Sequence, residues 1–282
     1  MPRQRPVAML LSGTPTIEGA GVRLQRVFGH AEVPRFDPFL LLDDFGSATP
    51  EDYLAGFPWH PHRGIETVTY MLAGSVEHGD SLGNRGLIGP GDVQWMTAGR
   101  GIVHQEMPQR TEGPLRGLQL WVNIPAASKM GEPRYREIGA AELPLVSPHA
   151  GLAVRVIAGE VAGVRGPVQD AVIDPQYLDI TLEPGADLEH PTPVGHTVFA
   201  YAVEGAGRVG AGAAHELRRG ELALFGAGGS VTAAAGGRAF RLLLVSGRPI
   251  GEPIAWSGPI VMNTDEELAT AFHEYREGRF AR

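Results

Sequence analysis

The sequence predicts an all-β protein built from two β-barrels in tandem, with a short helix at the C-terminal end. Its 282 residues include 39 glycines and 23 prolines, which mark many turns between short strands. The strand pattern of the first half begins again in the second half, as expected for an internal repeat. Hydrophobic residues make up 43% of the chain, which is enough for a substantial core.

The first barrel is expected over residues 1–130. Its strands alternate apolar and polar residues or carry β-branched side chains, as half-buried and buried strands do. They are predicted at residues 22–30, 36–45, 66–72, 93–96 and 115–125. Asp43 and Asp44, in the second of these segments, are interpreted either as ligands or as the cap of a turn, and we favour the turn.

Four side chains of this barrel have the spacing of a metal site. One residue separates His60 from His62, and one separates His104 from Glu106. Residues i and i+2 of a strand point to the same face, so each pair can present two ligating atoms side by side. Three imidazoles and one carboxylate suit iron, manganese, nickel, copper or zinc, and open coordination positions indicate catalysis or ligand sensing. Either pair alone is a weak signal, so the order of the surrounding motifs decides the interpretation.

That order resembles the two motifs of the cupin fold, a jelly-roll-like barrel. HPHRGIETVTYMLAG, HGDSLGNRG and PGDVQWMTAGRGIVHQEMP, which together run from His60 to Pro108, closely resemble the pirin family of cupins. So do FDPFLLLDDF, LQLWVNIP and, near the end, GEPIAWSGPIVMNTDEEL, and the resemblance covers most of the chain. It implies two cupin barrels, of which the first binds metal.

The resemblance also implies roles for individual residues. His60, His62, His104 and Glu106 are the implied metal ligands. Glu106 is in addition the candidate catalytic base that takes a proton from the substrate. The implied metal is iron (Fe²⁺), with another divalent transition metal as the alternative.

Neighbouring residues have two interpretations each. Trp59 and Phe57 either bind the substrate as walls of the metal pocket or fill the barrel mouth. Glu66, whose counterpart ligates metal in many other cupins, is expected to support the site or to be structural. Arg63 either orients an anionic ligand or, as we prefer, pairs with Glu66 or a nearby aspartate. His78, in a predicted polar loop, is either an extra site residue or, as we prefer, simply solvated.

Residues 131–150 are rich in proline, glutamate and small residues and are predicted to form a linker. The second cupin barrel is expected over residues 151–282. Its segments 198–210 and 219–234 parallel the strands that surround the metal motifs of the first barrel.

The second barrel is predicted to lack the metal ligands. In the alignment of the two repeats, Ala233 and Ala235 stand opposite the later histidine and glutamate of the first barrel. Thr192 stands where the second ligand of the HPH motif would be. His190 and His196 remain a weaker alternative for a second site.

The end of the chain is predicted to be helical. Thr264 is a suitable N-cap, and Glu267 three residues later completes a capping box. Apolar residues three and four positions apart give one face that is expected to pack on a barrel, and Gly278 ends the helix.

The pirin resemblance implies a quercetin 2,3-dioxygenase, which opens the ring of a flavonol with dioxygen and releases carbon monoxide. The substrate would be a small aromatic molecule. The alternative is an iron-binding, redox-responsive regulator that acts through protein partners. A third interpretation is a stable bicupin whose metal has another role. We favour the enzyme.

Composition excludes other classes. A net charge of -8 argues against direct nucleic-acid binding. The chain has no cysteine, so disulfides and thiolate ligands are excluded and any redox response must come from the metal. No apolar run approaches the ~18–20 residues of a membrane span, and the N-terminus lacks the apolar core of a secretory signal. A cytoplasmic protein is therefore expected.

Overall fold

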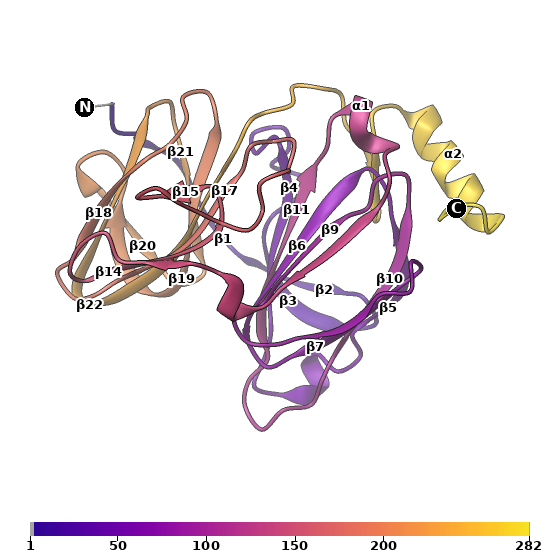
Figure 1. Cartoon of the computed structure of the whole chain (residues 1–282), viewed down its shortest axis with the longest axis horizontal. Coiled ribbons are helices and arrows are strands. Elements are labelled where there is room, and N and C mark those ends of the chain that lie inside the picture. The colour runs from indigo at the N-terminus through magenta and orange to yellow at the C-terminus, as the bar shows by residue number, and fades with distance from the viewer. Residues whose placement is uncertain (1–2, 282) are drawn as a thin grey trace. The chain divides into compact units, whose positions relative to one another are not determined.

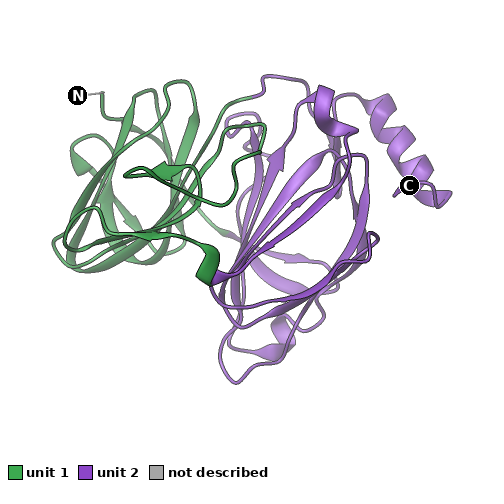
Figure 2. Cartoon of the chain, viewed as in Figure 1, with its two compact units in different colours: residues 1–13, 141–249 green, residues 14–140, 250–282 purple. Residues whose placement is uncertain are grey.

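The computed structural model describes residues 3–281 and separates the chain into two compact units (Figure 2). Unit 1 comprises residues 1–13 and 141–249, and unit 2 comprises residues 14–140 and 250–282. Both are built mainly from antiparallel strands, which confirms the predicted all-β class. No helix within the described residues combines the length and apolar composition needed to cross a membrane.

Unit 2 is a barrel of two antiparallel sheets. One has the strand order β12-β9-β6-β11-β4-β3-β2, and the other has the order β5-β10-β7-β8 (Figure 1). The strands are β2 (Thr14–Glu18), β3 (Val22–Phe28), β4 (Phe39–Phe45), β5 (Phe57–His62), β6 (Ile65–Ala73), β7 (Val76–Asp80), β8 (Arg85–Ile88), β9 (Val93–Thr97), β10 (Ile102–Pro108), β11 (Arg116–Asn123) and β12 (Arg134–Ile138). Glu106 on β10 bonds to side chains of β6 and β11, so the two sheets meet across a common interior.

Unit 1 is organised around one large sheet with the order β1-β21-β19-β22-β17-β14-β13, to which β18 and β20 add. Its strands are β1 (Val7–Ser12), β13 (Leu145–Val146), β14 (Leu152–Ala158), β17 (Gln176–Leu182), β18 (Asp187–Pro191), β19 (Thr197–Val209), β20 (His215–Arg218), β21 (Glu221–Phe225) and β22 (Ser230–Gly247), with the short pair β15 (Glu160–Val161) and β16 (Val164–Arg165). The run β21-β19-β22-β17-β14 corresponds in order to β9-β6-β11-β4-β3 of unit 2. The internal repeat seen in the sequence is therefore a repeat of topology.

The boundaries of the two units differ from those predicted at residues 130 and 150. Each unit also includes a segment from the other end of the chain. Strand β1 pairs with β21 and so belongs to unit 1. The hairpin of β23 (Ala255–Ser257) and β24 (Ile260–Met262) belongs to unit 2, where the Val261 N–H donates to the Arg63 carbonyl at 3.1 Å.

The segment predicted to be a linker is also structured. Strand β12 pairs with β9 along its whole length and is the edge of the larger sheet in unit 2. Strand β13 pairs with β14 in unit 1. The proline- and glutamate-rich composition of residues 131–150 therefore reflects short edge strands rather than a free connection.

Polar and apolar residues occupy different levels of the interior of unit 2. Along β6, Ile65 and Met71 belong to two separate apolar clusters, and Thr67 and Thr69 lie between them on the same face. On β10 the apolar residue Ile102 is likewise followed on the same face by polar residues, His104 and Glu106. A polar band therefore crosses this barrel, whereas the inward-facing residues at the same level of unit 1 belong to one apolar cluster.

The C-terminal helix α2 (Asp265–Arg276) begins as predicted. Thr264 Oγ1 accepts from the Glu267 N–H, and the Glu267 carboxylate accepts from the Thr264 N–H, each at 3.2 Å. Leu268, Ala271 and Phe272 pack on an apolar cluster of unit 2. The predicted capping box and the packing of this helix on a barrel are both confirmed. The remaining helices are short: α1 (Ala126–Lys129) and single 3-10 turns at Pro50–Asp52, Ala140–Glu142 and Ala211–Ala213.

Candidate metal centre

Three predicted ligands converge in unit 2. His60 and His62 lie on β5, and His104 lies on the neighbouring strand β10, directly opposite His60 in the register. Their ligating nitrogens all lie within 4.8 Å of one another. Alternation along the two strands turns these side chains into the barrel, because residues i and i+2 share a face. The prediction that these histidines meet is confirmed.

The hydrogen bonds of His60 and His62 set their tautomers. Nδ1 of His60 lies 2.9 Å from the Pro58 carbonyl oxygen, and Nδ1 of His62 lies 3.0 Å from the Pro259 carbonyl oxygen. A carbonyl oxygen only accepts, so each Nδ1 carries the proton and each Nε2 presents a lone pair. The two Nε2 atoms face each other at 3.1 Å, and burial lowers the pKa of His62 well below its usual value. Two lone pairs in this arrangement fit a shared cation.

His104 supports the same conclusion. It is fully buried, and neither ring nitrogen has a hydrogen-bond partner among the described residues. Burial and the neighbouring histidines lower the pKa of His104 well below its usual value, which favours the neutral imidazole that binds metals. An unpaired polar group costs free energy when buried, and coordination of a metal would remove that cost.

Glu106 lies two residues after His104 on β10 and is buried. Thr69 Oγ1 donates to Glu106 Oε1 at 3.0 Å, and Gln119 Nε2 donates to Oε2 at 2.9 Å. Its oxygens are not in the group of ligand atoms within 4.8 Å, and the strand register is irregular between it and His104. Its role as fourth ligand or base therefore stays a prediction.

A cavity of about 510 Å³ opens beside the histidines. Its lining comprises Glu18, Gly19, Ala20, Arg26, His30, Leu41, Asp43, Phe57, Pro58, His60, His62, Glu106, Gln119, Trp121, Trp256, Gly258 and Pro259. Phe57 therefore lines the cavity, in agreement with the first of its two predicted positions. Trp59 is 49% exposed and does not line the cavity.

Two tryptophans that the sequence analysis did not assign form an aromatic wall instead. The Trp121 ring meets the His62 ring edge to face at 5.0 Å between centroids, and it lies 5.9 Å from the Trp256 ring. The Trp121 Nε1–H donates to Gln119 Oε1 at 3.1 Å, which turns the Gln119 amide nitrogen toward Glu106. The alternation in LQLWVNIP carries a signal for Trp121, but nothing local predicts that Trp256 reaches the site.

The C-terminal hairpin completes the centre through close backbone contacts. Gly64, after β5, has a φ of 78°, and a Cβ there would collide with the Val261 carbonyl oxygen. Beneath this turn the buried Lys129 ammonium donates to the Gly64 carbonyl at 2.7 Å and to Asn123 Oδ1 at 2.6 Å. Burial lowers the pKa of Lys129 to about 8.

Arg63 and Glu66 have other partners than expected. Arg63 Nη1 lies 2.7 Å from Glu274 Oε2 on α2, so the expected pairing of Arg63 with Glu66 or an aspartate is wrong. Glu66 accepts from the Trp95 indole at 3.0 Å and from the Thr97 hydroxyl at 2.7 Å. Because Glu66 is three residues from Thr69 on β6, it points to the opposite face from the metal centre. Of the two roles predicted for Glu66, these contacts favour the structural one.

His78 lies on β7 and is fully buried, so the preferred interpretation of a solvated loop histidine is wrong. Its Nε2 lies 3.2 Å from Asp80 Oδ2, and its ring stacks on Tyr135. Its centroid is 5.5 Å from that of His104, which places it behind the metal ligands. It is a neighbour of the centre and not one of the three converging histidines.

The far end of the cavity is charged. Arg26 and Asp43 form a bidentate pair, and Arg26 also contacts Glu18. Burial raises the pKa of Asp43 to about 6, against the opposing effect of the guanidinium. Asp43 therefore does not cap a turn, as the sequence analysis favoured, but points into the cavity.

Unit 1 holds no comparable group of ligands within the residues that the structure describes. Ala233 and Ala235 are buried in its apolar cluster. The Arg5 guanidinium donates to Thr192 Oγ1 at 2.8 Å, so a fixed cation lies at the position corresponding to the second ligand. Burial lowers the pKa of His190 to about 4, and His190 lies apart from any metal-ligand group.

Comparisons with known proteins agree with this fold. Two family models match the chain, Pirin over residues 21–122 and Pirin C-terminal cupin domain over residues 177–281. The chain is 46% identical over 278 residues to a pirin-like protein of Caulobacter vibrioides, covering 98% of this chain and 99% of that protein. It is 45% identical over 285 residues, covering 100% of both, to a Pseudomonas aeruginosa protein whose name proposes a quercetin 2,3-dioxygenase. Its structure is similar to that of quercetin 2,3-dioxygenase from Acinetobacter baumannii, with a TM-score of 0.89, 33% identity and 98% of each chain covered.

Proposed function

The chain belongs to the pirin family of cupin proteins, and on that premise we propose that it is a metal-dependent dioxygenase that opens a flavonol such as quercetin. The convergence of three histidines on a cavity with aromatic walls carries this proposal. The relatives from P. aeruginosa and A. baumannii are named for quercetin 2,3-dioxygenase and support the same reaction class.

We propose iron(II) as the metal, held by His60, His62 and His104, with Glu106 as a fourth ligand or as the base. Neutral imidazoles beside a carboxylate suit iron and also other divalent transition metals. When bound, the metal would supply Lewis-acid activation of the substrate anion and redox chemistry with dioxygen. A cytoplasmic location and a small aromatic substrate are part of the same proposal.

In this proposal Glu106 takes the proton from the enolic hydroxyl of a flavonol. An ionised carboxylate offers about four lone pairs, and the bonds from Thr69 and Gln119 use two of them. These two donors fix the plane of the carboxylate and leave lone pairs for a substrate hydroxyl. Because Trp121 in turn fixes Gln119, the base is held by a chain of hydrogen bonds that begins in the cavity wall.

The aromatic residues of the cavity suit a planar ligand. Trp121, Trp256 and Phe57 offer ring faces or edges, and Leu41 adds an apolar surface. The volume of about 510 Å³ falls within the usual range of small-molecule sites. Packing a planar ring against these walls would orient its reactive edge toward the histidines and exclude water from it.

Oxygen uptake and carbon monoxide release with quercetin test this function. The iron-loaded protein should give both signals, and His62→Ala should lose them together with its bound iron. His215→Ala, at an exposed histidine of unit 1, is the matched control and should behave like the wild type. Wild-type signals no larger than those of free iron at the same concentration would eliminate the dioxygenase.

One observation favours a second function, the metal-responsive binding of a protein partner. His62 bonds to the Pro259 carbonyl, and the adjacent Arg63 bonds to Glu274 of α2. The ligand strand is thus connected directly to a helix whose outer face is exposed. Pull-downs with metal-loaded and metal-stripped protein test this function, and identical sets of captured proteins would exclude it.

A further inference from the structure

A row of polar side chains crosses the interior of unit 2, from the metal centre to the far end of the cavity. Arg26 on β3 lies directly opposite Asp43 on β4. Asp43 lies opposite Gln119 on β11, which in turn pairs with Thr69 on β6. Directly opposed residues of antiparallel strands share a face, so all four point into the barrel. Gln119 and Thr69 both bond to Glu106, so the row begins at the candidate base.

The corresponding strands of unit 1 carry only apolar residues at this level. Val156 on β14 pairs with Leu178 on β17, Leu178 with Leu244 on β22, and Leu244 with Ala200 on β19. All four belong to the apolar cluster of that unit. The fold therefore forms without a polar row. Because a buried charge costs free energy relative to apolar packing, the buried carboxylates of Asp43 and Glu106 in unit 2 point to a ligand.

The charged end of the row retains hydrogen-bonding capacity. Arg26 Nε and Nη2 donate to Asp43 Oδ1 and Oδ2 at 3.0 and 2.8 Å, and Nη1 donates to Glu18 Oε1 at 2.9 Å. A guanidinium has five N–H groups, so two remain, and both carboxylates have further lone pairs. The three side chains line the same cavity as His60 and His62.

Charge and distance define what these groups can bind. One guanidinium and two carboxylates carry a net negative charge, which disfavours an anionic ligand and favours neutral hydrogen-bond donors. Arg26 lies two strands away from Gln119, so at ~4.8 Å per strand the separation is about 10 Å. A planar molecule of several aromatic rings spans such a distance when one end lies against Glu106.

We propose that Arg26, Asp43 and Glu18 bind hydroxyl groups on the substrate ring farthest from the metal, and so select flavonols with hydroxylated outer rings. This inference rests on the proposed function and names the substrate class of the same site. The carboxylates accept hydrogen bonds from phenolic hydroxyls, and the guanidinium donates to the hydroxyl oxygens. A flavonol without outer hydroxyls would displace water from these groups without replacing its hydrogen bonds, and would be used less well.

The test compares kcat/KM for quercetin and for 3-hydroxyflavone, which lacks the outer hydroxyls. The wild type should prefer quercetin by about tenfold or more, as expected for hydrogen bonds to charged groups. The double variant Arg26→Val, Asp43→Ile replaces both charged side chains with branched apolar ones, as at the corresponding pair Val156 and Leu178 of unit 1. It removes both charges together, so neither is left buried alone, and the preference should fall toward unity.

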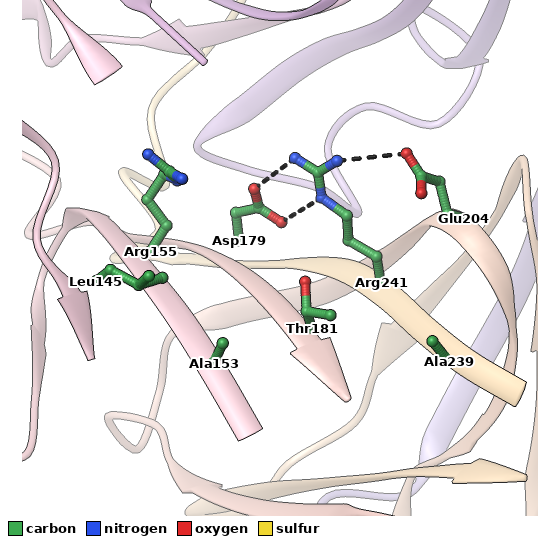
Figure 3. Close-up of a pocket in the computed structure, with 8 residues that line it drawn as sticks. All are labelled: Leu145, Ala153, Arg155, Asp179, Thr181, Glu204, Ala239 and Arg241. Carbon is green, nitrogen blue, oxygen red and sulfur yellow. Dashed lines mark hydrogen bonds and ion pairs between the residues drawn. The ribbon is translucent and has the colours of Figure 1, made fainter. Parts of the chain in front are cut away.

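Unit 1 offers a matched control. In a pocket of about 370 Å³, Arg241 forms the same bidentate pair with Asp179, at 2.9 and 2.8 Å, and also contacts Glu204 (Figure 3). No histidine lines that pocket. The double variant Arg241→Val, Asp179→Ile should therefore keep the wild-type preference.

The outcomes separate this inference from the proposed function. Equal use of both flavonols by the wild type, or a preference that survives in the Arg26→Val, Asp43→Ile variant, overturns the inference and leaves the dioxygenase standing. If neither flavonol is consumed, the proposed dioxygenase activity is excluded. Calorimetric titration of the metal-loaded protein with each flavonol then tests the inference by itself. For the inference to stand, quercetin must bind the wild type more tightly than 3-hydroxyflavone does, and the double variant must lose that difference. If the double variant does not fold, Asp43→Asn, which keeps the side-chain shape, must reduce the preference for the inference to stand.

Discussion

Replacing Arg63 with methionine should release α2 from unit 2 while the metal centre stays largely intact. Arg63 is 3% exposed, and its Nη1 lies 2.7 Å from Glu274 Oε2. Its Nη2 donates to the Phe280 carbonyl at 3.1 Å, and its guanidinium carbon lies 4.3 Å from the centroid of the Phe280 ring. Methionine keeps an apolar chain over that ring and removes the polar contacts of the Arg63 side chain.

The size of the effect follows from these contacts. A hydrogen bond to a charged group contributes about 1.5–3 kcal/mol, a neutral one about 1 kcal/mol, and a cation–π contact about 0.5–2 kcal/mol. The ion pair contributes at the lower end, because the Glu274 side chain is 28% exposed and rehydrates once released. Burial of a guanidinium whose Nε has no hydrogen-bond partner among the described residues offsets part of the gain. The docking of α2 should weaken by about 2–3 kcal/mol.

Hydrogen exchange of the α2 amides measures this docking. A loss of 2–3 kcal/mol corresponds to exchange about 30- to 150-fold faster. Arg276→Met, at an exposed arginine of the same helix, is the control and should leave exchange unchanged. Metal affinity should fall less than tenfold, because the Arg63 carbonyl still accepts from the Val261 N–H and keeps the hairpin on β5. Unchanged exchange in α2, or metal loss as large as the change in exchange, would refute this reasoning.

Three further predictions follow from single contacts. Thr264→Ala removes the capping box and should lower the unfolding free energy of the helix by about 1 kcal/mol, measured by urea titration of α2 exchange; an unchanged midpoint would contradict it. Burial lowers the pKa of Lys129 from 10.5 to about 8, so between these pH values the unfolded chain binds more protons than the folded one. The wild type should therefore gain up to about 3 kcal/mol of stability as pH rises from 8 to 10.5, and Lys129→Met should lack this gain in denaturant titrations at each pH. Removing the metal by chelation leaves the lone pairs of His60 and His62 opposed, so the Tm of the wild type should fall. The Tm of His104→Ala should change little on chelation. Calorimetry measures both, and equal shifts in the two Tm values would argue against a three-histidine site.

The sequence was sufficient for the features that depend on local spacing. One residue between His60 and His62 fixes a common face on any strand, and the structure brings both to His104. The same alternation explains why Trp59 lies outside the cavity, because it is adjacent to His60 and therefore points away from it. Strict use of strand parity would have removed Trp59 from the cavity, but it would also have removed Phe57, which lines the cavity where the register between β5 and β10 is irregular.

Other features depend on contacts between distant segments, which no local pattern encodes. Trp256 and Pro259 reach the metal centre from residues that the repeat assigned to the second barrel. Arg26 meets Asp43 because β3 pairs with β4 in one particular register. His78 was misjudged because its glycine- and aspartate-rich surroundings look like a loop, whereas pairing with β10 makes them a buried strand.

The bond from His62 to the Pro259 carbonyl has a consequence for biosynthesis. A ribosome makes the HPH motif early and the Pro259 segment almost 200 residues later. A nascent chain can close most of the barrel around its histidines, but one imidazole has no carbonyl to orient it until the final hairpin emerges. The complete three-histidine site should therefore form only after that hairpin has been made and has folded onto the barrel.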